Sequence, residues 1–125
     1  MRRLPALILA SALVTACGGG GDGVKDLGTI TASGAPSSQT ATVGMNDALD
    51  FTPNIVLARV GTLTITADNL GRIPHDLVFD QPGLGQSDRI DGKRSADVRV
   101  AFTETGTFTF VCTLHPGMTG KVVVS

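Results

Sequence analysis

The sequence predicts an all-β protein, folded as an antiparallel Greek-key β-sandwich. Short runs alternate apolar and polar residues, as Leu63-Thr64-Ile65-Thr66 does, and a period of two is typical of half-buried strands. Turn-forming glycines and prolines separate these runs at short intervals, which is the pattern of a sandwich. No apolar stripe with the 3.6-residue period of a helix persists beyond about two turns after the N-terminal segment. A chain of 125 residues fits one such domain.

Roughly six to eight short strands are expected in the region 39–125. Val98, Val100 and Phe102 share the parity of one strand, with charged residues between them. All five phenylalanines fall in this region, and we expect them to supply much of the core. The segment 80–95 is rich in Gly, Asp, Arg and Lys, and it is expected to be a solvated loop. Turn signals stand at residues 69–71, 81–83, 91–92 and 105–106.

The N-terminus has the features of an export signal. A short basic start is followed by an apolar run from Leu4 to Val14, which is too short to span a bilayer as a helix. The run ends in Leu13-Val14-Thr15-Ala16-Cys17, which resembles the lipobox of bacterial lipoproteins. That resemblance implies that residues 1–16 are removed and that lipid on Cys17 anchors the exported protein to a membrane, in the periplasm or on the outer cell surface. The alternative is an ordinary secretory signal followed by an unmodified cysteine.

Residues 17–38 are expected to form a flexible tether between this anchor and the folded domain at 39–125. The tether contains a glycine-rich run at 18–23 and a second run of small residues at 33–38. Without Arg2 and Arg3, eight basic side chains face 11 acidic ones, a net charge of −3. This scattered, weakly negative charge argues against a nucleic-acid partner.

Four residues near the ends of expected strands carry the candidate chemistry: His75, Cys112, His115 and Met118. The chain has two histidines, and Cys112 is its one cysteine beyond residue 17. A thiolate, two imidazoles and a thioether are the donors of a mononuclear blue-copper site, which favours a single bound copper ion and one-electron transfer. Parity supports the grouping, because Cys112 shares a strand face with two phenylalanines and so points inward with them.

The chain resembles the cupredoxins, the type 1 blue copper proteins that include plastocyanin, amicyanin and pseudoazurin. One similar stretch runs from Asn69 through His75 to Phe79, and a second runs from Gly106 through Cys112 to Met118. The Cys-x-x-His-x-x-Met spacing is that of the short amicyanin loop. The resemblance covers roughly residues 39–125. It implies a cupredoxin sandwich with the four residues above as copper ligands and a role as an electron carrier, not an enzyme.

Two departures from the family pattern concern the surroundings of the thiolate. Asp76 stands where the family usually has Asn, and its carboxylate is expected to accept hydrogen bonds from the hydroxyl of Thr113 and from backbone N–H groups. Leu114 stands where Pro is frequent, so an N–H is available to the sulfur, as is the N–H of Asp76. Leu114 is also expected to join a small apolar patch around His115 where a redox partner docks on a monomeric carrier.

Several alternatives remain open at this point. Zinc accepts cysteine and histidine but gains nothing from a thioether. A Cys17–Cys112 disulfide would consume the thiolate. Among functions, copper storage or delivery is the main rival to electron transfer. An accessory subunit of a redox enzyme and a metal-free structural lipoprotein are the others.

Overall fold

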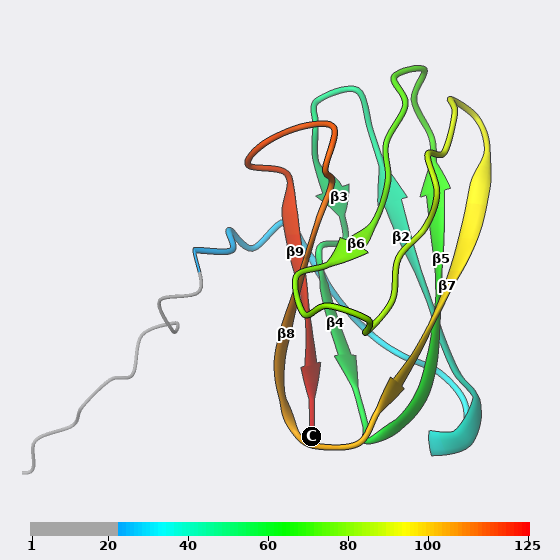
Figure 1. Cartoon of the computed structure of the whole chain (residues 1–125), viewed down its shortest axis with the longest axis vertical. Helices are drawn as coiled ribbons and strands as arrows, with labels where there is room; N and C mark the ends of the chain where they lie inside the picture. Colours follow the sequence, from blue (N-terminus) through cyan, green and yellow to red (C-terminus); the bar gives the residue numbers. More distant parts are fainter. Residues whose placement is uncertain (1–22) are drawn as a thin grey trace, which may run out of the picture.

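The computed structural model describes residues 23–125, and this part of the chain contains nine strands and one short 3₁₀ helix. The strands form two sheets packed face to face, which confirms the predicted β-sandwich (Figure 1). In chain order the elements are β1 Thr29–Thr31, the 3₁₀ helix η1 Pro36–Ser38, β2 Gln39–Met45, β3 Phe51–Thr52, β4 Ile55–Ala58, β5 Gly61–Asn69, β6 Val78–Phe79, β7 Ser95–Phe102, β8 Gly106–Val111 and β9 Thr119–Val124.

The pairing within the two sheets is mixed, which corrects the predicted antiparallel pairing while the β-sandwich itself is confirmed. One sheet has the order β1-β4-β9-β8-β6 and the other the order β3-β2-β5-β7. β2 runs parallel to β5, and β4 runs parallel to both β1 and β9. The alternation of side chains reports which residues face the core, but it says nothing about the direction of the neighbouring strand.

The core lies between the sheets and is built as the parity of the sequence predicts. Val98, Val100 and Phe102 of β7 are buried, while the residues between them are more exposed. At the centre the Phe110 ring contacts two other aromatic rings edge to face, with centroid distances of 5.0 Å to Phe51 and 5.6 Å to Phe79. This packing fixes β8, the strand that leads into Cys112.

The folded domain begins before residue 39, so the predicted tether at 17–38 is too long. Strand β1 pairs with β4, and Ile30 packs against the core. Farther back, the buried Asn54 side chain accepts a hydrogen bond from Leu27 N over 2.8 Å and donates to the carbonyl of Lys25. A strand of three residues is too short to show a period, and its partner follows about two dozen residues later, so composition alone suggested a flexible linker.

A non-lipidated protein that begins at Gln39 is therefore expected to be less stable than one that begins at Gly23. The shorter chain loses the partial burial of Ile30, and the buried Asn54 side chain loses its hydrogen bonds with Leu27 and Lys25. Together these losses should lower the free energy of unfolding by about 3 kcal/mol. Urea denaturation of the two proteins measures the difference. Equal midpoints would mean that the tether does extend to residue 38.

The predicted signal at residues 1–16 and the lipid-bearing Cys17 lie outside the described residues. Between residues 23 and 125 there is no helix whose length and apolar character would let it cross a membrane.

Candidate metal centre

His75 lies between β5 and β6, where its backbone and its ring are both fixed. Its N–H donates to the carbonyl of Ile90 over 3.1 Å, and the N–H of Ile90 donates back over 2.7 Å. The side chain is fully buried, and Nε2 lies 2.9 Å from the carbonyl oxygen of Asn46. Because a carbonyl only accepts, Nε2 carries the hydrogen and Nδ1 is the basic nitrogen. Burial lowers the pKa of His75, which favours the neutral ring.

The other three candidates lie on the turn between β8 and β9. The N–H of Cys112 donates to the carbonyl of Met118 over 3.0 Å, and the N–H of Met118 donates to the carbonyl of His115 over 3.1 Å. Gly117 has a φ of 90°, in the left-handed region that favours glycine. The turn therefore closes tightly between two adjacent antiparallel strands.

His75, Cys112 and His115 meet at this end of the sandwich. Their candidate ligand atoms all lie within 4.8 Å of one another. Sγ of Cys112 is 3.8 Å from Nδ1 of His75, and the centroids of the two imidazole rings are 4.9 Å apart. The thiol is 2 % exposed, while His115 is only half-buried. The structure thus brings three of the four predicted ligands to one point.

The His115 ring is held by a hydrogen bond, whereas the Met118 side chain is held by packing in the core. Nε2 of His115 lies 3.0 Å from the carbonyl oxygen of Pro74, so this nitrogen also acts as a donor, which leaves Nδ1 as the candidate ligand atom. Met118 is 2 % exposed and belongs to the core cluster. Its role as a fourth, axial ligand stays a prediction.

Two backbone N–H groups act on the Cys112 sulfur, as the sequence predicts. The N–H of Asp76 lies 3.4 Å from Sγ, and the N–H of Leu114 is the second donor. Burial raises the pKa of the Cys112 thiol, and the nearby Asp76 carboxylate raises it further, while the two N–H groups lower it. The net direction is upward, so the thiol is protonated at neutral pH when no metal is bound.

The Asp76 carboxylate connects the two ligand-bearing segments. Its Oδ1 accepts the N–H of Thr113 over 2.6 Å, and its Oδ2 accepts the hydroxyl of the same residue. This is the acceptor role predicted from the sequence. Asp76 therefore ties the residue after His75 to the residue after Cys112.

Comparison with known proteins agrees with this geometry. The family model described as a cupredoxin-like domain matches residues 8–124. The chain is a cupredoxin. It is 30 % identical over 113 residues to a copper-resistant cuproprotein, CopI, of Rubrivivax gelatinosus, covering 72 % of this chain and 68 % of CopI. It is 39 % identical over 64 residues to amicyanin of Paracoccus denitrificans, covering 49 % of this chain and 48 % of amicyanin.

Solved structures extend the likeness to the fold. The oxidised state of an amicyanin point mutant aligns with a TM-score of 0.55 at 30 % identity, covering 67 % of this chain and 80 % of that one.

The residues present in this cupredoxin fit copper. One soft cysteine sulfur and two imidazoles converge at a largely buried place, and this donor set suits Cu(I) and Cu(II) alike. The Asp76 carboxylate, which adjoins the cluster, is hydrogen-bonded to Thr113. The predicted cofactor, one copper ion, is thus supported by both the family and the donor set.

Some residues that support the site were not foreseen from the sequence. Asn46, Pro74 and Ile90 act through backbone atoms, which leave no side-chain signal. The segment 80–95 is also less solvated than predicted, because Ile90 is buried beside His75 and Ser87 Oγ accepts the N–H of Leu77. Isolated residues such as Ile90 and Ser87 within a charged segment form no periodic pattern, so their burial could not be inferred from the sequence.

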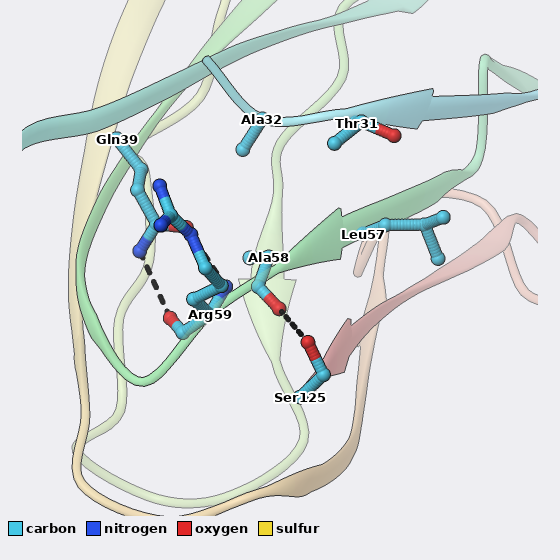
Figure 2. Close-up of a pocket in the computed structure, with 7 residues that line it drawn as sticks. All are labelled: Thr31, Ala32, Gln39, Leu57, Ala58, Arg59 and Ser125. Carbon is cyan, nitrogen blue, oxygen red and sulfur yellow. Dashed lines mark hydrogen bonds between the residues drawn. The ribbon is translucent and has the colours of Figure 1, made fainter. Parts of the chain in front are cut away.

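A pocket of about 310 Å³ lies far from these ligands, at the end of the sandwich that holds the C-terminus (Figures 1 and 2). Within it the Gln39 amide donates to the carbonyl of Arg59 over 2.9 Å, and the hydroxyl of Ser125 donates to the carbonyl of Ala58 over 3.4 Å. Its lining offers no histidine, cysteine or carboxylate side chain to a metal. The residues that line it are Thr31, Ala32, Gln39, Leu57, Ala58, Arg59 and Ser125.

Proposed function

We propose that this cupredoxin carries single electrons between redox partners and is not itself an enzyme. Cys112, His75 and His115 would hold the copper ion, with the Met118 thioether as a weak fourth donor. The bound ion supplies a centre that accepts one electron and returns it by cycling between Cu(II) and Cu(I). The chain's own residues hold the donors in place, exclude water and stabilise the thiolate.

The observation that best supports electron transfer is that hydrogen bonds within the protein already hold the donors. The Asn46 carbonyl fixes the ring of His75, and the Asp76 carboxylate bridges to Thr113. Two backbone N–H groups point at the Cys112 sulfur. Donors held in this way rearrange little when the charge of the ion changes, and a small rearrangement favours fast electron transfer.

Partners are proposed to dock on an apolar patch formed by Leu49, Leu70 and Leu114. These side chains are 40, 54 and 43 % exposed, and their loops lie at the end of the sandwich that carries the metal centre (Figure 1). His115, half-buried beside Leu114, would be the route by which the electron leaves. A small apolar patch suits a brief, weak complex between a monomeric carrier and its redox partner.

We also propose that the protein is exported and anchored through lipid on Cys17, at a periplasmic or outer membrane surface. The support is the sequence of residues 1–17. The folded domain begins before residue 39, so the free tether is shorter than composition suggested.

Copper storage or delivery is the second candidate, favoured by the relative that is named as a copper-resistant cuproprotein. The two functions differ in how firmly the ion is held. A carrier keeps copper through repeated reduction and oxidation, whereas a delivery protein yields Cu(I) to a competitor. Burial of Cys112 and His75 supports the carrier, because a competing ligand has little access to them.

A test should follow both copper retention and electron self-exchange in the non-lipidated protein. We expect one copper per chain after many redox cycles in the presence of a Cu(I) chelator. We also expect self-exchange between the Cu(I) and Cu(II) forms, followed by NMR line broadening, to slow by about tenfold or more in Leu114→Glu, since like charges then meet at the contact. Leu57→Glu, at a position 38 % exposed on β4, is the matched control. Loss of copper to the chelator would favour delivery.

A further inference from the structure

Asp47, in the loop between β2 and β3, makes two hydrogen bonds to the segment that leads to His75. Its Oδ1 accepts the N–H of Arg72 over 2.7 Å and the N–H of Ile73 over 3.1 Å. These two donors lower the pKa of Asp47, and the charge of Lys93 lowers it further. One exposed carboxylate oxygen thus connects two loops that are 25 residues apart in the sequence.

The residue before Asp47 holds the ring of the same histidine. The carbonyl oxygen of Asn46 accepts the hydrogen of His75 Nε2 over 2.9 Å. Asn46 is itself immobilised, because its side-chain oxygen accepts the N–H groups of Ala48 and Asp50 over 3.0 and 3.1 Å. Asp47 therefore holds residues 72 and 73, which precede His75 in the chain, while Asn46 holds the imidazole of His75.

Gly71 explains how the carboxylate comes so close to the neighbouring loop. A Cβ atom at this position would lie 2.0 Å from Oδ1 of Asp47 and 2.7 Å from its Cγ, far inside van der Waals contact. The φ of Gly71 is not in the left-handed region, so the glycine serves close approach and not an unusual backbone conformation. Any side chain at residue 71 would push Asp47 away from Arg72 and Ile73.

We propose that Asp47 is a positioning residue of the metal centre. Its carboxylate latches residues 72 and 73 onto the β2–β3 loop, and this holds His75 Nε2 against the Asn46 carbonyl and leaves Nδ1 directed at Cys112. The latch is formed by the protein alone, so the donor geometry exists before copper arrives. This inference rests on the proposed copper site, but its first consequence concerns the metal-free protein.

The test compares Asp47→Ala, which removes the acceptor, with Asp47→Asn, which keeps an acceptor oxygen in the same place. In the metal-free protein, Asp47→Ala should speed hydrogen exchange of the Arg72 and Ile73 amides by about tenfold or more. Its His75 should show both neutral tautomers in long-range ¹H–¹⁵N spectra, whereas the wild type shows one. Asp47→Asn should resemble the wild type, and Gly71→Ala should resemble Asp47→Ala.

Copper loading gives the second readout. Asp47→Ala should bind copper about 10- to 100-fold more weakly and show an altered Cu(II) EPR spectrum. The control is Asp26→Ala, because Asp26 is an exposed carboxylate that accepts the N–H of Gly28 over 2.9 Å in a local turn. Faster amide exchange with an unchanged tautomer and spectrum would overturn the proposal, as would an Asp47→Asn that behaves like Asp47→Ala. If the site does not bind copper, the copper affinity and the EPR spectrum will show no effect of Asp47→Ala. The changes in amide exchange and in the His75 tautomer will still appear in the metal-free protein.

Discussion

In Cys112→Ser the intense visible absorption of the copper-loaded protein should disappear, and copper affinity should fall by more than the roughly 10–100-fold that loss of a ligand's hydrogen-bonding partner costs. The thiolate is the soft donor of the set, and its charge transfer to Cu(II) gives the colour. A serine hydroxyl keeps its proton and offers a hard oxygen instead. Titration with Cu(II), followed by visible absorption and EPR, measures both effects. A variant that stayed coloured would remove Cys112 from the site.

Proton release provides a quantitative form of the same prediction. Burial raises the pKa of the Cys112 thiol, so the metal-free protein still holds that proton at pH 8. Burial lowers the pKa of His75, so its ring has none to give at that pH. Loading the wild type at pH 8 should therefore release about one proton per copper, and affinity should fall about tenfold for each unit by which the pH is lowered. Cys112→Ser should release none.

A matched control separates loss of the ligand from the general effect of a hydroxyl in this strand. Val111→Ser places the same group on the neighbouring residue of β8, whose side chain points to the opposite face. That variant should keep its colour and its proton release. If Val111→Ser and Cys112→Ser lost colour equally, the effect would come from a disturbed strand and not from the missing sulfur.

The convergence of three candidate ligands could be predicted from the sequence because it follows from strand parity and short spacing. Phe110 of β8 and Cys112, which directly follows that strand, point to the same face, so a buried ring implies a buried sulfur. Three residues later the turn brings His115 back over the same point. Residue types and spacing were therefore enough to predict most of the candidate ligands. Only His75 lies on a distant segment, and its place in the site was predicted from the resemblance of that segment to the cupredoxins.

The features that could not be predicted depend on contacts without a periodic signature. The carboxylate of Asp47 meets two backbone N–H groups across 25 residues, and nothing in the side-chain pattern marks those acceptors and donors as neighbours. The parallel pairing of β2 with β5 is likewise invisible, because an alternating strand has the same pattern in either direction. Strand β1 is too short to alternate at all.

Gly120→Ala is expected to destabilise this domain strongly, because the added methyl group would clash with a ring of the core. Gly120 lies on β9 directly across from Phe110 of β8. A Cβ there would lie 2.3 Å from two carbons of the Phe110 ring and 2.7 Å from the carbonyl oxygen of Asn54. The ring cannot retreat, because Phe51 and Phe79 pack against it. The expected cost is about 3 kcal/mol of unfolding free energy, at the upper end of what overpacking a core usually costs.

A double-mutant cycle can show that the cost arises from the ring. Phe110→Leu alone should destabilise the domain by about 1–2 kcal/mol, because it leaves a cavity. In the double variant the methyl group introduced at residue 120 enters part of that space. The two effects should then fall short of additivity by about 1–2 kcal/mol in urea denaturation. Strict additivity would place the clash elsewhere, at the carbonyl of Asn54. Because Phe110 and Gly120 stand just below the turn that carries Cys112 and Met118, the same cycle also measures how firmly the sandwich supports the metal centre.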